Sequence, residues 1–271
     1  MQKTAAPPEL KGMTPNVVSD RYSGQDWVRT AVQVPTEMAL AVHVNRRELV
    51  TILCTPTRLN SLVLGFLFAE GIISGLDEVT GMRICEEESL ADVTLGDSNY
   101  EPPARRILTS GCGGGATFKI QGQRFDSDLV VSPKDVLSLM KQLQKRMVLY
   151  RRCGGVHTSA LADADGLLVV AEDIGRHNTF DKIQGECLLR KLSTEGRILL
   201  STGRVSSEML LKAARMKTPI VVSRHSPTGS AVSLARELGI ALVGHARGGS
   251  LSVYSHPGRL GLKAHERNAP G

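Results

Sequence analysis

The sequence has few aromatic residues and no long apolar run. Phe, Trp and Tyr make up 4% of the 271 residues, with one tryptophan. Aliphatic side chains must therefore fill the core, and the stacking platforms that bind single-stranded nucleic acid are missing. The longest apolar stretch, 62–73, is interrupted by Gly65 and Glu70. We therefore expect neither a nucleic-acid-binding protein nor a membrane-spanning one.

Closely spaced cysteine pairs and a secretory signal sequence are also missing. The first 24 residues are polar and contain several prolines, unlike the apolar core of a signal peptide. The cysteines are odd in number, and their spacing indicates no disulfide framework. These features predict a cytoplasmic protein with reduced thiols. The five cysteines are Cys54, Cys85, Cys112, Cys153 and Cys187.

What the chain does contain is enough apolar residues for a sizeable core, many glycines and a positive charge. Hydrophobic residues account for 41% of the chain, and 27 residues are glycine. The formal net charge is +6 and the isoelectric point is near 9.2. This charge favours an anionic ligand or an acidic partner protein.

The pattern along the chain predicts an α/β fold in two unequal parts. Residues 1–25 read as a flexible tail, 26–106 as a smaller, partly β amino-terminal portion, 107–256 as the main α/β domain, and 257–271 as a second tail. In the main domain, apolar strands at 167–171, 197–201, 219–223, 240–244 and 251–254 alternate with helices at 177–192, 206–216 and 229–238. Ser132 and Pro133 begin a further helix that is expected to reach about residue 150.

Four polar loops follow the strands of the main domain, at 172–177, 202–204, 224–229 and 245–250. Each combines glycine or hydroxyl residues with basic side chains, including Arg204, Arg224 and Arg247. Ligands of open α/β sheets bind at the carboxyl ends of the strands, where helix amino termini attract phosphates. The loops therefore predict a site for an anion, although polar loops are also common on any surface.

Cys112 lies within Thr109-Ser110-Gly111-Cys112-Gly113-Gly114-Gly115. A buried structural cysteine is normally surrounded by apolar residues, whereas glycines leave this thiol accessible. The pattern favours a nucleophile or a sulfur carrier. A glycine-rich hairpin with an incidental cysteine is the alternative. A dinucleotide fingerprint through Gly111, Gly113 and Ala116 is disfavoured, because no helix signal follows it.

Several segments, taken in order, resemble one family, the formate dehydrogenase accessory sulfurtransferases known as FdhD. The resemblance covers residues from about 35 to 255. Its motifs are Glu70-Gly71-Ile72, Ser110-Gly111-Cys112-Gly113, Gly154-Gly155-Val156-His157-Thr158-Ser159-Ala160, Glu172-Asp173-Ile174-Gly175-Arg176-His177-Asn178 with Asp181-Lys182, Gly203-Arg204-Val205-Ser206-Ser207-Glu208-Met209, Ser226-Pro227-Thr228 and Val243-Gly244-His245-Ala246-Arg247-Gly248.

The resemblance implies a cytidine deaminase-like layered core with a smaller amino-terminal portion, usually as a homodimer. It implies a sulfur carrier that receives sulfur from a cysteine desulfurase as a persulfide, with Cys112 at the persulfide position. The sulfur then passes to the molybdenum of a bis-molybdopterin guanine dinucleotide cofactor, which activates the catalytic subunit of formate dehydrogenase.

The resemblance also suggests which residues meet that cofactor. The last loop, which comprises His245, Ala246, Arg247, Gly248, Gly249 and Ser250, is the first candidate for the guanine dinucleotide. Arg204, Ser226 and Thr228 are second-line contacts. GDP or GMP should then bind as partial mimics of the cofactor.

The chain departs from the family at Gly115, where many members have the second cysteine of a C-x-x-C pair. Any mechanism that needs two thiols is therefore in doubt. Cys153 could relay sulfur, although it is more simply a loop cysteine. A non-catalytic chaperone that holds and delivers the molybdenum cofactor is the alternative to a sulfurtransferase.

Two further features remain to be interpreted. His157 begins a helix-like stretch where deaminase-like folds carry a zinc ligand, but the chain has neither H-x-E here nor any C-x-x-C, so no metal site is expected. The Glu172–His177 cluster is either structural, with a capping carboxylate and a His177–Asp181 pair, or part of the site that holds the Cys112 loop or the pterin.

Overall fold

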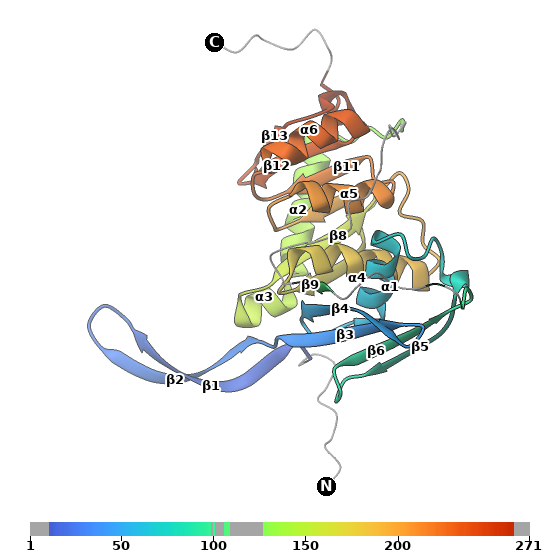
Figure 1. Cartoon of the computed structure of the whole chain (residues 1–271). Helices are drawn as coiled ribbons and strands as arrows, with labels where there is room; N and C mark the ends of the chain where they lie inside the picture. The colour runs from blue at the N-terminus through green and yellow to red at the C-terminus, as the bar shows by residue number, and fades with distance from the viewer. Residues whose placement is uncertain (1–10, 99, 101–105, 109–126, 263–271) are drawn as a thin grey trace.

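The computed structural model describes residues 11–98, 100, 106–108 and 127–262. These residues form three β-sheets and the helices that cover them (Figure 1). The mixed α/β class expected from the sequence is confirmed. Its likeness to cytidine deaminases stays a prediction.

A six-stranded sheet forms the centre of the carboxyl-terminal part, in the order β13-β12-β11-β10-β8-β9. β10, β11 and β12 run parallel, whereas β8, β9 and β13 are antiparallel to their neighbours. The strand bounds are β8 His157–Ala162, β9 Leu167–Asp173, β10 Ile198–Ser201, β11 Ile220–Ser223, β12 Ala241–Arg247 and β13 Ser250–Val253.

Helices cover both faces of this sheet because successive strand residues point to opposite sides. In β10, Leu199 packs in one core with α4, α5 and α6, whereas Ile198 and Leu200 pack in a second core with α2. The central strands β10 and β11 are therefore buried along their whole length. The helices are α2 Pro133–Lys145, α4 Arg176–Leu189, α5 Ser207–Arg215 and α6 Gly229–Leu238.

The amino-terminal part has its own five-stranded sheet, in the order β5-β6-β3-β4-β7, and its own core beneath α1. The 3-10 helix η2 (Leu76–Glu78) leads into β5. The other elements are α1 Leu59–Ala69, β3 Met38–Val44, β4 Arg47–Cys54, β5 Val79–Cys85, β6 Leu90–Leu95 and β7 Arg106–Leu108.

Two glycines bring the two parts together by allowing α1 to lie directly on α4. A Cβ atom on Gly65 would fall 1.8 Å from the carbonyl oxygen of Asp181, and one on Gly185 would fall 1.9 Å from that of Ser61. Only glycine permits so close an approach of two helix backbones. Gly65 and Gly185 therefore set the distance between the two parts.

Four expectations need correction. Part of the expected amino-terminal tail, Met13–Tyr22, is strand β1, which pairs with β2 (Trp27–Pro35). In the expected carboxyl-terminal tail, Pro257–Leu260 forms the 3-10 helix η3, anchored by the buried Leu260. His157 begins strand β8 and not a helix, because its backbone pairs with Asp173 of β9.

The fourth correction concerns the helix expected from 132 to about 150. α2 ends at Lys145, because Arg146 and Met147 leave helical geometry before the short α3 (Val148–Cys153) begins. Within the described ranges, no helix is long and apolar enough to cross a membrane.

Candidate functional site

Three of the four predicted polar loops come together at one edge of the six-stranded sheet and line a cavity of about 280 Å³. The parallel strands β10 and β11 end at this edge, so the loops after them contribute Arg204 and the pair His225 and Ser226. β8 is antiparallel and begins here with His157, and Arg176 follows the end of β9. The lining residues are His157, Arg176, Arg204, His225 and Ser226.

Buried hydroxyl groups hold the strand ends behind the cavity. The Ser201 hydroxyl accepts a hydrogen bond from the Gly203 amide at 3.0 Å, and the Ser223 hydroxyl donates to the Gly203 carbonyl at 2.7 Å. A Cβ atom on Gly203 would lie 3.0 Å from the Arg176 Cβ and 3.3 Å from the His157 Nδ1. Gly203 therefore lets the β10 loop pass close to the other two loops that line the cavity.

The cavity is suited to an anion. Its described lining carries two guanidinium groups and two imidazoles and contains no carboxylate. Burial, followed by the charges of Arg176 and His225, lowers the pKa of His157. His157 is therefore neutral at physiological pH and can hydrogen-bond a ligand, while the arginines supply the charge. The guanidinium of an arginine can donate two parallel N–H groups to the oxygens of one phosphate.

The structure brings some of the predicted cofactor residues to this cavity. Arg204 and Ser226 line it, and Ser226 is within hydrogen-bond distance of His245, at 3.2 Å between Oγ and Nε2. Thr228 lies at the start of α6, where its hydroxyl accepts a hydrogen bond from the Ala231 amide at 3.2 Å and caps the helix.

The rest of the predicted loop lies elsewhere. Strand β12 continues past His245, and Ala246 is fully buried in the core that the sheet forms with α2. Arg247 pairs with Ser250 across the β12–β13 turn, in which Gly248 and Gly249 have positive φ angles of 62° and 85°. These four turn residues are not part of the cavity lining, so their role in nucleotide binding stays a prediction.

Sequence reasoning did not single out His157, Arg176 and His225 as cavity residues. The sequence offers His157 only as a metal ligand, and Arg176 and His225 only as members of longer loops. A signal is present for Arg176 and His225, which lie in polar loops after predicted strands, but not for His157, which is expected in a helix-like stretch. What was missing was the antiparallel direction of β8, which brings His157 to the same edge.

The Asp173 carboxylate of the 172–177 cluster is buried and structural. Its Oδ2 atom lies 2.6 Å from Lys182 Nζ and accepts the Thr55 amide at 3.0 Å, while Oδ1 accepts the Gly175 amide and the Asn178 side chain, both at 2.8 Å. Lys182 also donates to the Thr55 carbonyl at 3.0 Å. Because Thr55 belongs to the amino-terminal part, this network joins the two parts beside the cavity.

The other cluster residues differ from the expected pairing. Glu172 accepts the backbone N–H groups of residues 148–150, at 2.9 to 3.1 Å, and so caps α3. Asp181 binds Lys212 at 2.5 Å, not His177. His177 Nε2 instead lies 3.3 Å from Ser206 Oγ and 3.4 Å from the Glu208 carboxylate.

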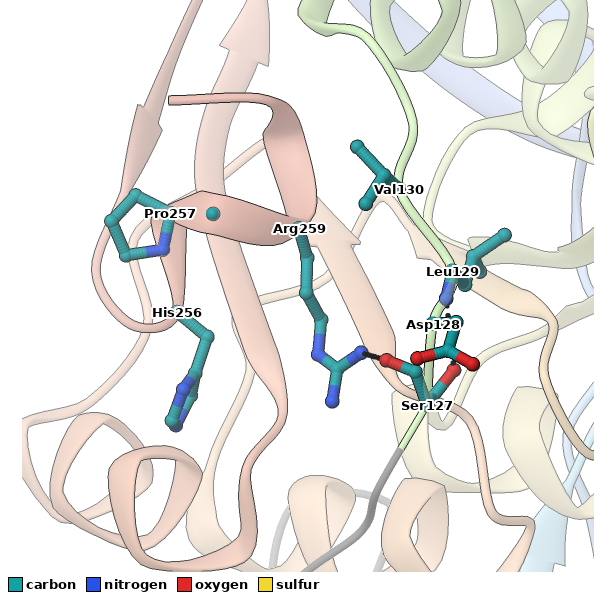
Figure 2. A pocket seen from close by; sticks show the side chains of 8 residues that line it. Ser127, Asp128, Leu129, Val130, His256, Pro257 and Arg259 are labelled. Atoms are coloured by element: carbon teal, nitrogen blue, oxygen red, sulfur yellow. Dashed lines mark hydrogen bonds between the residues drawn. The ribbon is translucent and has the colours of Figure 1, made fainter. Parts of the chain in front are cut away.

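The predicted nucleophile, Cys112, lies outside the described residues. The described chain on either side belongs to different parts of the fold. β7 pairs with β4 of the five-stranded sheet, whereas Ser127 is held by the Arg259 guanidinium, which donates to its carbonyl (Figure 2). A hollow of about 450 Å³ lies beside that contact, between residues 127–130 and 256–259.

Three of the four described cysteines, Cys54, Cys153 and Cys187, are poor sulfur carriers. Burial raises the pKa of Cys54 and of Cys187 to about 12. Burial, and then the Glu172 carboxylate, raises the pKa of Cys153, whose Sγ lies 3.1 Å from the Leu149 carbonyl oxygen. Since the thiolate is the reactive form, none of the three is activated for sulfur transfer.

Comparison with known proteins agrees with this picture. The model of the FdhD/NarQ family matches residues 35–261. Proteins named sulfur carrier protein FdhD from Bacillus subtilis and Staphylococcus haemolyticus are 38% and 36% identical, over 89% of this chain and 95% and 94% of theirs. A crystal structure of a formate dehydrogenase accessory protein from Desulfotalea psychrophila superposes with a TM-score of 0.77 and 27% identity, covering 92% of this chain and 99% of that one. The chain belongs to the FdhD/NarQ family.

Proposed function

We propose that this protein is a sulfur carrier that serves the maturation of formate dehydrogenase. The observation that carries the proposal is the family match, which runs through residues 35–261 and so includes the Cys112 loop. The relatives that match along most of the chain are named sulfur carriers. The raised pKa of Cys54, Cys153 and Cys187 disfavours these three thiols, and Cys112 is the candidate that the motif Ser110-Gly111-Cys112-Gly113 indicates.

The loading step is an exchange of one sulfur atom. The Cys112 thiolate attacks the outer sulfur of a persulfide on a cysteine desulfurase. A new S–S bond forms on Cys112 as the donor's S–S bond breaks, and the donor cysteine leaves as a thiolate. The step needs no external oxidant or reductant. Glycine at positions 113, 114 and 115 adds no side chain that could cover the thiol.

The acceptor in this proposal is the bis-molybdopterin guanine dinucleotide molybdenum cofactor, which is cargo and not a resident group. The cavity of Arg176, Arg204 and His157 fits the phosphate portion of such a molecule, because it offers cations and a neutral hydrogen-bonding imidazole without a described carboxylate. Its volume of about 280 Å³ suits part of a nucleotide and not the whole cofactor. GDP and GMP are therefore suitable probes.

A titration with GDP distinguishes the cavity from the glycine turn as the phosphate site. If the phosphate binds in the cavity, Arg204→Ala should weaken GDP binding about 10- to 100-fold, the usual range for one lost charged hydrogen bond, and Arg247→Ala should not. The opposite result would place the phosphate at the β12–β13 turn, as the sequence predicted.

The remaining parts of the proposal concern the setting of the reaction. The sulfur donor is a cysteine desulfurase, the recipient of the sulfurated cofactor is the catalytic subunit of formate dehydrogenase, and the protein acts in the cytoplasm as a homodimer. The described cysteines form no disulfide with one another, which fits a reducing compartment.

A cofactor chaperone without covalent chemistry is the second candidate, and Gly115 favours it, since a C-x-x-C disulfide cannot form. Intact-mass spectrometry after incubation with a cysteine desulfurase and L-cysteine separates the two. A reductant-sensitive gain of one sulfur atom, about 32 Da, that is lost in Cys112→Ala and kept in Cys153→Ala supports the carrier. No gain with an active desulfurase supports the chaperone.

A further inference from the structure

Strands β1 and β2 form an arm that projects from the body of the protein (Figure 1). The arm turns at Ser23–Asp26, where the Ser23 amide donates to the Asp26 carbonyl at 3.1 Å. Its principal contact with the body is at its base, where β2 meets α3 and the buried Met13 packs with Leu149 and Val156. The rest of the arm has no covering layer of described residues.

An isolated two-stranded ribbon is at best marginally stable in water. Such ribbons normally persist when a third strand, a helix or another chain covers one face. This arm nevertheless displays large apolar side chains. The exposed fractions are 71% for Trp27, 56% for Tyr22 and 60% for Val18. Trp27 is the single tryptophan of the chain.

The strand register places these side chains on one face. Directly opposed residues of an antiparallel pair share a face, and the next pair but one shares it again. The pairs Val18–Ala31, Asp20–Arg29 and Tyr22–Trp27 therefore form one continuous strip, which we call the arm strip. All six of its residues are exposed. The Tyr22 and Trp27 rings lie 5.3 Å apart, and Arg29 Nε lies 3.4 Å from an Asp20 oxygen.

We propose that the arm strip is a self-association surface that packs face to face on the arm strip of a second copy of this chain. Its charge pattern selects that occupant. The strip carries one acid and one base side by side between two apolar pairs, so a two-fold axis along the arm sets Asp20 opposite Arg29 of the second copy. The same axis sets Tyr22 opposite Trp27.

The competing two-fold, perpendicular to the arm and in the plane of the interface, would set Asp20 opposite Asp20. Like charges directly opposed across packed sheets are destabilising. The charge pattern therefore selects the arrangement in which both arms point the same way. In such an isologous contact each copy contributes the same residues, as in most soluble dimers.

The size of the contact sets its expected strength. Each aromatic ring can bury about 150–250 Å², so the arm strip would remove on the order of 500 Å² per copy from water. The total then lies near the lower limit of about 1,000 Å² for a specific interface. We therefore expect a dimer with a micromolar dissociation constant. The family resemblance predicts a homodimer but does not indicate which surface forms it. The arm strip is the surface proposed here, and its role does not depend on the sulfur chemistry.

Analytical ultracentrifugation of the full chain tests the surface. The wild type, with a monomer mass of 29.2 kDa, should shift from monomer to dimer between low and high micromolar concentration. The emission of Trp27 should shift to the blue over the same range. Val18→Ser should weaken the dimer more than tenfold. The matched control is Val130→Ser, because Val130 is also 60% exposed but lies far from the arm in sequence and fold.

A charge-mixing experiment tests the two-fold geometry. Arg29→Asp makes the centre of the strip wholly acidic and Asp20→Arg makes it wholly basic, so each variant alone should be monomeric. An equimolar mixture of the two should form heterodimers, because every acid then faces a base across the interface. The ion pair within each arm stays broken in both variants, so its restoration cannot explain the result.

Three outcomes would overturn the proposal: a monomeric wild type at 100 µM, single-charge variants that dimerise as well as the wild type, or monomeric variants that fail to pair when mixed. Far-UV circular dichroism and the thermal midpoint of each variant verify that the body remains folded.

Discussion

Replacing Gly65 with alanine tests the contact that joins the two parts of the fold. The new Cβ atom would lie 1.8 Å from the Asp181 carbonyl oxygen and 2.5 Å from its carbonyl carbon. Non-bonded carbon atoms pack at about 3.5–4.0 Å, so α1 and α4 must separate by on the order of 1.5 Å. A gap of that size forfeits more than half of the dispersion attraction between the facing atoms of the two helices.

The expected loss of unfolding free energy is about 3–5 kcal/mol. Overpacking of a core typically costs about 1–3 kcal/mol, and here the obstacle is helix backbone, which cannot rotate away as a side chain can. The sign is informative, because alanine in place of glycine inside a helix normally stabilises by about 1 kcal/mol. Gly185→Ala should behave in the same way, since its Cβ would meet the Ser61 carbonyl oxygen at 1.9 Å.

Urea unfolding followed by far-UV circular dichroism is the suitable assay, because the single tryptophan lies on the arm and does not report on the α1–α4 contact. Gly229→Ala is the matched control. Gly229 is the first residue of α6, and a Cβ atom there would have no neighbour within 4 Å. Its stability should stay within about 1 kcal/mol of the wild type. A Gly65→Ala protein whose midpoint matches the wild type would refute the packing argument.

Three further predictions concern buried charges and titrating groups. Lys182→Met should destabilise by about 3–5 kcal/mol, because it leaves the Asp173 carboxylate buried without its cation; adding Asp173→Asn in the same chain should recover part of that loss in urea unfolding. Burial, and then the charges of Lys212 and Arg176, lower the pKa of His177 to about 3. As pH falls below about 6.5, this histidine therefore takes up a proton in the unfolded chain but not in the folded one, and protonation favours unfolding. Between pH 8 and pH 5 the wild type should lose about 2 kcal/mol more unfolding free energy than His177→Gln. GDP should bind more tightly as pH falls, because a bound phosphate raises the lowered pKa of His157, and calorimetry should show a weaker pH dependence in His157→Gln.

The Glu208 carboxylate, 3.4 Å from His177, opposes the shift assigned to that histidine, because it favours the charged imidazole. Glu208 is 40% exposed, however, so water screens its field, whereas the His177 side chain is only 11% exposed. Burial therefore dominates and the pKa falls. If the wild type and His177→Gln lose stability in parallel as pH falls, this assignment is wrong.

The carboxyl-terminal sheet could be predicted from sequence because each strand is a short apolar run between clear helix signals. Ser206 and Thr228 cap α5 and α6 as such residues commonly do, and the helix expected at 229–238 has the observed bounds. Strand β1 could not be predicted from burial pattern, since it is largely exposed and the alternation of apolar and polar residues that marks a half-buried strand is weak.

The site was predictable to the level of its loops and not of its side chains. Arg204 and Ser226 line the cavity because each lies in the loop that follows a parallel strand, β10 or β11. Arg247 lies outside the cavity lining because β12 continues past Gly244, with an irregularity in its pairing, as far as Arg247. The chain then turns back through Gly248 and Gly249 into β13. The expected strand ends at residue 244 and β12 ends at Arg247, and a change of three residues in where a strand ends decides which side chains line a cavity. Sequence does not resolve strand ends to that level.

The motif Glu172-Asp173-Ile174-Gly175-Arg176 has two roles, because its side chains point in different directions. Asp173 points inward to Lys182 and Thr55 and fixes the amino-terminal part, whereas Arg176, at the start of α4, lines the cavity. A ligand that draws on Arg176 therefore acts on the same turn that joins the two parts of the fold. The structural alternative for this cluster is therefore correct in part, because Asp173 joins the two parts and Glu172 caps α3, whereas Asp181 pairs with Lys212 and not with His177. The binding alternative depends on Arg176, which lines the cavity, and stays a prediction.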